Sequence, residues 1–268
     1  MQVLNLTNIE ESDIKYSISR FPDGEVQITL DSIDRKDMVR VVCRITNAED
    51  LFILGQVADI LNRQGVQFKI VILYLMSMRM DRVMDFNRPF SLKIVTDFIN
   101  SLDAVSVAIC EPHSMRSVVE LDANSFYIRP QEFNEPVQRV FPDKGAAERE
   151  VVRPNDLVFE KVRDLGTGKI NSLKLSNPEK ISGKTFYVKD DLCDGGGTFV
   201  GIAKALRELV PDAKLYISVC HMVNPRGIEN LSANYDHVWF TNSYKNWENL
   251  PENVTQIDVT NNWRSPQE

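Results

Sequence analysis

The chain has few cysteines and no long apolar run, and both absences narrow the class of protein. Its four cysteines include no C-x-x-C pair, which excludes the common zinc and thioredoxin-type motifs. Sparse, unpaired cysteine fits a reducing compartment. No apolar run approaches the roughly 20 residues that a membrane span requires, and the first residues lack the basic region and apolar core of a signal peptide. We therefore expect a cytoplasmic protein with no membrane partner.

Basic charge is also scarce. The chain has 31 Lys and Arg residues against 38 Asp and Glu residues, which gives a net charge of -7. Nucleic-acid-binding proteins usually carry a basic excess or a basic stripe, so we expect no nucleic-acid partner. The length of 268 residues, with 43% hydrophobic residues, is enough for two packed domains.

Apolar runs of strand length alternate with segments of helical periodicity. Residues 68–75 (FKIVILYL) are almost continuously apolar, as in a parallel strand that is covered on both faces. Before them, Asn47 and Gly65 bracket a helical pattern as N-cap and stop signal. This alternation predicts an α/β fold with two domains, each a mainly parallel sheet flanked by helices. We place the domains at residues 1–128 and 129–268.

An acidic pair and a glycine-rich loop lie between a strand-like run and a helical pattern, in the sequence VKDDLCDGGGT (188–198). Successive glycines let the backbone approach an anion, and the helix start adds its positive dipole. Paired carboxylates can accept hydrogen bonds from sugar hydroxyls, directly or through Mg²⁺. A glycine-rich turn at an acidic helix end is the alternative, but the Asp-Asp-x-x-Asp pattern favours a ribose-phosphate site. The expected binding residues are Asp190, Asp191, Asp194, Gly195, Gly196, Gly197 and Thr198.

This motif resembles the phosphoribosyl-pyrophosphate loop of type I phosphoribosyltransferases and of ribose-phosphate pyrophosphokinases, the phosphoribosyl pyrophosphate synthetases. The rest of the chain favours the synthetases, because further segments resemble theirs in the same order. These segments are RFPDGEV (20–26), YLMSMRMDR (74–82), RPFSLK (88–93), EPH (111–113), FPDK (141–144) and FEKVR (159–163). The resemblance implies two phosphoribosyltransferase-like domains, a nucleotide-binding half followed by a ribose-phosphate-binding half.

The resemblance also implies roles for individual residues. Residues that would bind ATP are Phe21, Asp23, Glu25, Arg79, Asp81 and Arg82, the first three of them across a subunit interface of a homo-oligomer. His113 and Asp143 would position Mg²⁺. Lys161 and Arg163 would stabilise the transition state, with His113 as a third catalytic residue. Such positively charged groups suit phosphoryl transfer, which depends on positioning and charge stabilisation more than on a covalent nucleophile.

The implied reaction transfers the β,γ-diphosphate of ATP to the anomeric hydroxyl of ribose 5-phosphate and releases AMP, as in nucleotide biosynthesis. Three departures from the family pattern are Met80 for Gln, Glu111 for Asp and Gly195 for Thr. A loop without the Thr side chain could admit a larger phosphate ester, so the same chemistry on ADP-ribose, in NAD salvage, stays open. A type I phosphoribosyltransferase and a non-catalytic regulatory subunit of a synthetase are the remaining alternatives.

Overall fold

The computed structural model describes residues 1–126, 133, 136–163 and 170–260; for residues 161–163 and 170–172 it describes the backbone alone. The chain divides into two compact units, Met1–Ile128 with Asp258–Glu268, and Arg129–Ile257. The division predicted from the sequence, 1–128 and 129–268, places the whole C-terminal part of the chain in the second unit, whereas the segment from Asp258 belongs to the first unit. Within that unit, Thr260 Oγ1 donates a 3.1 Å hydrogen bond to Glu11 Oε2, and Val259 and Thr260 are buried.

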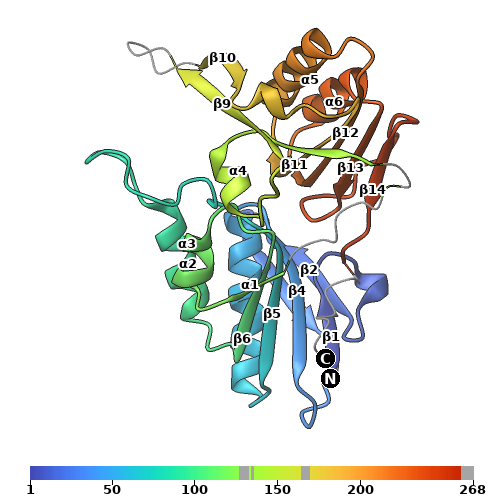
Figure 1. The fold of residues 1–268 in the computed structure, drawn as a ribbon. Helices are drawn as coiled ribbons and strands as arrows, with labels where there is room; N and C mark the ends of the chain where they lie inside the picture. The colour runs from blue at the N-terminus through green and yellow to red at the C-terminus, as the bar shows by residue number, and fades with distance from the viewer. Residues whose placement is uncertain (127–132, 134–135, 164–169, 261–268) are drawn as a thin grey trace. The chain divides into compact units, whose positions relative to one another are not determined.

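The first unit is built on a five-stranded sheet in the order β1-β4-β5-β6-β7, and every pair of neighbours is parallel (Figure 1). Its strands are β1 (Gln2–Asn5), β4 (Val39–Ile45), β5 (Phe68–Leu75), β6 (Ser106–Cys110) and β7 (Asn124–Phe126). A short 3-10 helix, η1 (Ile9–Glu11), follows β1. Because β4, β5, β6 and β7 are parallel neighbours, the loops that follow them emerge at one edge of the sheet.

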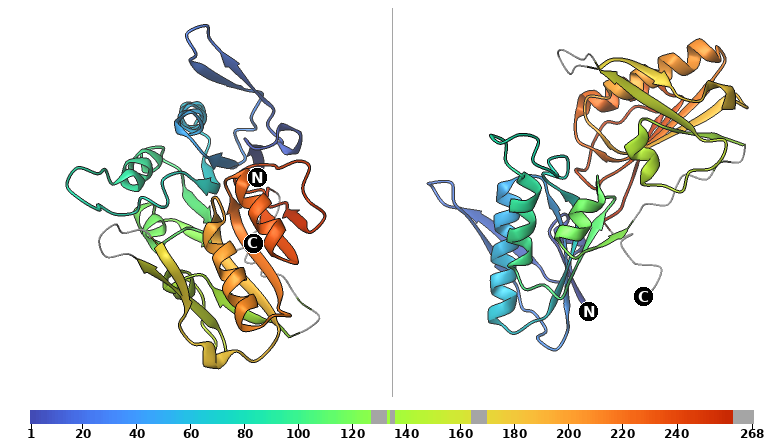
Figure 2. Two further views of the ribbon diagram at one scale, coloured as in Figure 1. Left: turned by 90° about the horizontal axis from the view of Figure 1, so that it is seen from above. Right: turned by 60° about the vertical axis from the view of Figure 1, so that its left-hand side comes forward.

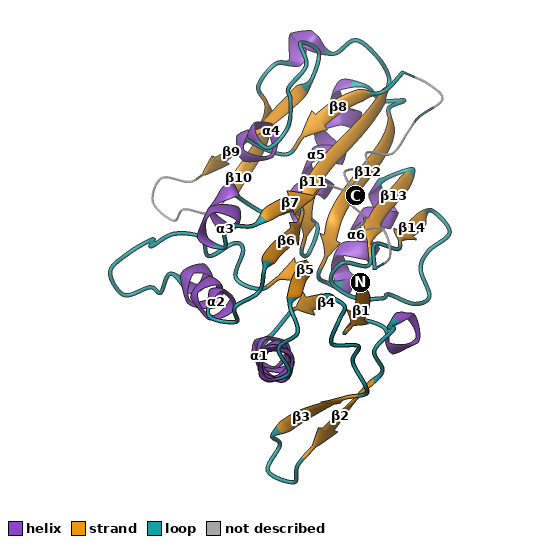
Figure 3. Ribbon diagram, turned by 90° about the horizontal axis from the view of Figure 1, so that it is seen from below, coloured by secondary structure: helices purple, strands orange, loops and turns teal. Residues whose placement is uncertain are grey.

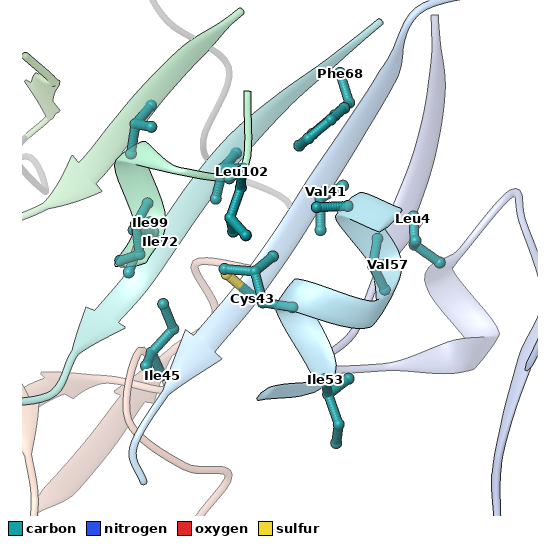
Figure 4. Packing of buried hydrophobic residues seen from close by; sticks show 14 of the residues in the cluster. Leu4, Val41, Cys43, Ile45, Ile53, Val57, Phe68, Ile72, Ile99 and Leu102 are labelled. Atoms are coloured by element: carbon teal, nitrogen blue, oxygen red, sulfur yellow. The ribbon is translucent and has the colours of Figure 1, made fainter. Parts of the chain in front are cut away.

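Helices connect the parallel strands: α1 (Ala48–Arg63), α2 (Ser91–Asn100) and α3 (Met115–Glu120). The predicted start of α1 is confirmed, because Asn47 caps the helix and forms a reciprocal capping box with Asp50. One face of the sheet packs against α1 and α2, and Figure 4 shows Cys43 of β4, Val57 of α1 and Ile99 of α2 among the side chains of this core. Burial on this scale is the main stabilising contribution to the unit.

An antiparallel hairpin, β2 (Tyr16–Arg20) and β3 (Val26–Leu30), forms a separate sheet and extends away from the body of the first unit (Figure 2). Two contacts join it to α1. Gln56 Oε1 accepts a 2.9 Å hydrogen bond from the Ile28 amide, and Gln56 Nε2 donates to the Val26 carbonyl at 2.8 Å. Arg20 Nη2 of β2 donates to Glu49 Oε1 at 2.6 Å. Val26 and Ile28 are buried against the core, so β3 is held from its middle to its turn end, while the turn residues themselves stay exposed.

The second unit contains a seven-stranded sheet in the order β10-β9-β8-β11-β12-β13-β14, parallel except for β10 (Figure 3). The strands are β8 (Gln138–Phe141), β9 (Leu157–Arg163), β10 (Ile170–Leu175), β11 (Thr185–Cys193), β12 (Lys214–Met222), β13 (His237–Thr241) and β14 (Val254–Ile257). The helices are α4 (Lys144–Glu148), η2 (Pro178–Lys180), α5 (Gly197–Leu209) and α6 (Pro225–Asn234). The expected α/β class with mainly parallel sheets is confirmed.

The two faces of the second sheet are covered differently. On one face, α5 and α6 pack on buried residues such as Phe186, Val188 and Ile217. On the other, α4 covers Phe141. Farther along the same sheet lies a group of aromatic rings. The distances from the centroid of the Phe133 ring to three neighbouring ring centroids are 5.0, 5.1 and 5.7 Å, within the usual range of about 4.5–7 Å for ring pairs. The members of this group are Phe133, Tyr187, Tyr216, His237 and Trp239.

Candidate functional site

The acidic pair and the glycine loop lie at the carboxyl end of β11. This strand is interior to the sheet, because it pairs in parallel with β8 on one side and β12 on the other. Asp190 and Asp191 lie near the carboxyl end of the strand, and the chain passes through Asp194 to Gly196 before α5 begins. This is the edge of an open α/β sheet at which ligands bind. The predicted strand, loop and helix therefore occur in the predicted order.

The loop presents the start of α5 without a side-chain cap. Gly196 is the N-cap residue with a φ of 78°, in the left-handed region that glycine adopts at little cost. The cap residue is a glycine, so it has no side chain of its own to accept hydrogen bonds from the first amides of the helix. Uncapped amides together with the helix dipole make such a position suited to an anion.

Side chains of α6 hold the loop from behind. Asn224 Nδ2 donates to Asp194 Oδ1 at 3.0 Å, and Asn230 Nδ2 donates to the Gly195 carbonyl at 2.7 Å. Between them, Gly227 lies so close that an added Cβ would be 2.3 Å from the Asp194 carbonyl oxygen. These three residues were not predicted from the sequence. Asn224 followed by Pro225 was the available signal, since this pair marks a helix start.

Arg149 bridges the two carboxylates of the acidic pair. Its Nη2 atom is 2.6 Å from Asp190 Oδ1 and 2.6 Å from Asp191 Oδ1. The Asp191 side chain is only 4% exposed, and those of Asp190 and Arg149 are 15% and 20% exposed. Burial, followed by repulsion from Asp191, raises the pKa of Asp190 well above its ordinary value, and the charge of Arg149 opposes that rise. Arg149 was not predicted from the sequence.

This pKa shift predicts that Asp190→Asn stabilises the protein while removing a binding group. Because the pKa of Asp190 is higher in the folded protein than in the unfolded chain, ionisation costs stability as the pH rises from 3.8 through the folded pKa. At pH 8 we expect the variant to melt above the unmodified protein, and we expect this advantage to shrink as the pH falls toward 3.8. Denaturant unfolding between pH 4 and pH 8 checks this, and an advantage that stays constant or grows toward pH 4 would contradict it.

Further ion pairs surround the acidic pair in the second unit. Lys189 pairs with Glu150, whose carboxylate also lies 3.7 Å from Arg139 Nη1. Arg139 in turn donates to Asp156 Oδ2 at 2.5 Å and to Asp156 Oδ1 at 3.0 Å. These groups are largely buried, so their charges need partners of opposite sign. The network fixes the segment that follows α4, including Arg149, against β11.

The other predicted residues of the second unit come from strands beside β11. Asp143 follows β8 and caps α4, where Asp143 Oδ1 accepts a 2.9 Å hydrogen bond from the Ala146 amide. Because β8 and β11 are parallel neighbours, Asp143 lies at the same edge of the sheet as the acidic pair. Lys161 and Arg163 belong to β9, where their backbones pair with Leu173 and Ile170 of β10. Their side chains lie outside the described part of the structure.

The first unit carries the predicted nucleotide-binding residues in two places. Phe21, Asp23 and Glu25 form the turn of the β2–β3 hairpin, where the Phe21 amide donates to the Glu25 carbonyl at 2.8 Å. Gly24 supplies the φ of 95° that the turn requires, and Phe21 is 49% exposed. Since the hairpin is a sheet of its own, these residues are not at the edge of the five-stranded sheet.

The remaining residues of this set follow β5 and β6, which are parallel neighbours. Arg79, Asp81 and Arg82 come after β5, with Arg82 Nε 3.5 Å from Asp81 Oδ1. His113 comes after β6, behind the buried Glu111, which has a φ of 38°. The structure therefore brings the Arg79–Arg82 segment and His113 to the same sheet edge of the first unit. His113 and Asp143, the predicted metal pair, belong to different units.

A preformed metal cage is not found among the described residues, since no group of three His, Cys, Asp or Glu side chains there could hold an ion. Mg²⁺ usually keeps several water ligands and binds through one or two carboxylates together with substrate phosphates. The carboxylates at the ends of β8 and β11 are donors of this kind. The donor set therefore fits an Mg²⁺ ion that arrives with phosphate groups.

Proteins from other organisms match this chain in sequence over most of its length. The ribose-phosphate pyrophosphokinase of Pyrococcus furiosus is 26% identical, and the match covers 95% of this chain and 90% of that protein. That of Sulfurisphaera tokodaii is also 26% identical, with 90% and 87% covered. The chain is related to the ribose-phosphate pyrophosphokinases. This confirms the resemblance seen in the sequence, and with it the prediction of a transferase enzyme. No family model matches the chain.

The fold agrees with the relationship to the ribose-phosphate pyrophosphokinases. The crystal structure of a phosphoribosylpyrophosphate synthetase from Mycobacterium smegmatis matches with a TM-score of 0.76, covering 97% of this chain and 95% of that one at 18% sequence identity. The predicted fold class of two phosphoribosyltransferase-like domains is thereby confirmed. In the described part of the chain, no helix combines the length and the apolar character needed to cross a membrane.

Proposed function

We propose that the protein transfers the β,γ-diphosphate of ATP to the anomeric hydroxyl of ribose 5-phosphate and releases AMP. The observation that carries this proposal is the arrangement at the end of β11, where two largely buried carboxylates precede a helix start whose cap residue is Gly196. Carboxylates suit the vicinal hydroxyls of the ribose, and the amides of the loop suit its 5′-phosphate. The names of the relatives support the same reaction.

The other predicted residues enter the proposal with separate tasks. Loop residues Asp194, Gly195, Gly197 and Thr198 complete the phosphate site, and the ATP phosphates bind to Arg79, Asp81 and Arg82. Lys161 and Arg163 stabilise the charge that develops on the transferred group, and His113 assists them. Mg²⁺, held through Asp143 and His113 together with the phosphates, neutralises charge on ATP.

We further propose a homo-oligomer in which the hairpin turn of one subunit completes the ATP site of another. The support is the position of Phe21, Asp23 and Glu25 on a projecting hairpin, away from the sheet edge of their own unit. An aromatic ring with half of its surface exposed is a suitable partner for a purine base. No nucleic acid or membrane takes part in this reaction.

ADP-ribose is the second candidate acceptor, and the loop itself favours considering it. A Cβ atom added at Gly195 or at Gly197 would meet no heavy atom within 4 Å. The side of the loop where the family carries a Thr side chain is therefore open, and a 5′-phosphate that continues into a second phosphate could be accommodated. In that case the product is ADP-ribose pyrophosphate, and the chemistry at the anomeric hydroxyl is unchanged.

The test is AMP release by the purified protein from ATP and Mg²⁺, with ribose 5-phosphate, ADP-ribose or unphosphorylated ribose as the acceptor. We expect AMP release to require a phosphorylated ribose and Mg²⁺, with ribose itself inactive. ADP-ribose as the better acceptor would select the second candidate. AMP release that is independent of any acceptor, or absent with both, would refute the proposed reaction.

A further inference from the structure

We propose that Arg149 is a positioning residue that holds Asp190 and Asp191 in place to receive the two vicinal hydroxyls of the ribose. This inference rests on the proposed function of the loop but concerns a residue outside it. Arg149 follows α4, about forty positions before the acidic pair in the chain, and the hydrogen bonds between them span 41 and 42 residues. Tertiary packing, and not local sequence, brings the three side chains together.

The contact is a bridge and not a simple ion pair. One nitrogen atom, Arg149 Nη2, lies 2.6 Å from an oxygen of each carboxylate. Adjacent carboxylates repel each other, and in a buried position one of them tends to take up a proton. A guanidinium group between them opposes both the repulsion and the uptake of a proton. It also fixes the rotation of both side chains, because the planar guanidinium can donate hydrogen bonds to carboxylates only over a narrow range of positions.

The segment that carries Arg149 is itself anchored to β11. The neighbouring Glu150 pairs with Lys189, which directly precedes Asp190. Two neighbouring residues therefore pair with β11 in a complementary way: the positive Arg149 contacts the acidic pair, and the negative Glu150 contacts Lys189. Arg139 reinforces this arrangement at 3.7 Å from Glu150. With its neighbour held in this way, Arg149 has less side-chain freedom to lose when it orders the acidic pair.

The bridge is compatible with a bound sugar. A carboxyl group has several acceptor positions on its two oxygens, and the hydrogen bonds of Arg149 use Oδ1 of Asp190 and Oδ1 of Asp191. The acidic pair can therefore accept hydroxyl groups while it remains bridged. Arg149 would then contribute to sugar affinity without touching the atoms that react, which distinguishes it from the proposed catalytic residues Lys161 and Arg163.

The test compares Arg149→Met, Arg149→Lys and a matched control, Arg207→Gln, in the full-length protein. Arg207 belongs to the same unit but lies in the last turn of α5, at the opposite end of that helix from the loop. The measurements are KM for ribose 5-phosphate, KM for ATP, kcat, the dissociation constant of ribose 5-phosphate by calorimetry, and the melting temperature.

We expect Arg149→Met to weaken the binding of ribose 5-phosphate, so that its KM and its dissociation constant both rise about tenfold or more. The kcat and the KM for ATP should change less than about threefold. Arg149→Lys retains the charge without the planar bridge, so it should fold normally and recover part of the affinity. Arg207→Gln should leave both KM values, kcat and the dissociation constant unchanged; its effect is confined to the melting temperature, through the loss of contacts with Asn234 and Asp236. Loss of kcat at unchanged KM, or unchanged binding in both Arg149 variants, would overturn the proposal.

Calorimetry separates this inference from the proposed function. If the unmodified protein binds ribose 5-phosphate but releases no AMP, the proposed reaction fails, and weakened binding in Arg149→Lys still supports the bridge. If AMP release is normal and both variants bind the sugar as well as the unmodified protein does, the reaction stands and the role of Arg149 is refuted.

Discussion

Replacing Gly227 with alanine is expected to destabilise the protein and to disable the sugar-phosphate loop. The added Cβ would lie 2.3 Å from the Asp194 carbonyl oxygen and 2.9 Å from Cys193 Sγ, so α6 or the loop must shift. Such overpacking typically costs about 1–3 kcal/mol, equivalent to a melting temperature lower by roughly 2–12 °C in a chain of this size. Because the shifted atoms belong to the loop, binding of ribose 5-phosphate should weaken by more than tenfold.

The sign of this effect is diagnostic. At most interior helix positions, alanine is more favourable than glycine by about 0.5–1 kcal/mol. Gly183→Ala is the matched control, because a Cβ there would meet nothing within 4 Å and the residue lies outside the sugar-phosphate loop. That variant should keep the melting temperature and most of the AMP release. If Gly227→Ala melts as high as the unmodified protein and binds the sugar equally well, the close approach of α6 to the loop is wrong.

Lys161→Ala is expected to lower kcat for AMP release by about 10²-fold or more and to leave the fold intact. The proposed role of Lys161 is to stabilise charge on the transferred diphosphate, and loss of one such donor typically has an effect of this size. The melting temperature should change little, because a strand at this position tolerates a shorter side chain when its backbone pairing with β10 is kept. Rapid-quench measurement of AMP formation at saturating ATP and ribose 5-phosphate gives the rate.

Lys174→Ala on the neighbouring strand β10 controls for the loss of a positive charge from this hairpin. Lys174 is exposed and pairs in register with Glu160. The control should retain full activity. Equal activity in Lys161→Ala and the unmodified protein would remove Lys161 from the catalytic group.

The elements that were predicted well from the sequence are those whose pattern is local. The continuous apolar run of β5 was predicted with its observed bounds, since a strand buried on both faces needs apolar residues at every position. The Asn47 cap and the strand–loop–helix order around Asp190 were also correct. In each case, the residues that define the feature are neighbours in the chain.

The features that sequence reasoning missed depend on contacts between distant segments. Arg149, Asn224 and Asn230 complete the surroundings of the loop, but each comes from a helix or turn far from it in the chain. A single arginine among surface charges has no local mark that separates it from its neighbours. Gly227 is a similar case, because its lack of a side chain acquires meaning only when α6 packs against the loop.

The return of the chain to the first unit was missed for the same reason. The segment 258–260 is short and partly polar, so its sequence predicts neither a strand nor a helix. Their membership of the first unit follows from burial of Val259 and from the hydrogen bond between Thr260 and Glu11, which lie 249 positions apart. Two contiguous halves were the simplest expectation when only sequence order was known.

The most direct test of the account is a crystal structure of the protein with ribose 5-phosphate. The account predicts the 5′-phosphate at the amides of residues 195–198 and the 2- and 3-hydroxyls at Asp190 and Asp191, with the Arg149 bridge retained. A sugar bound elsewhere, or bound with its phosphate against the two carboxylates, would contradict it.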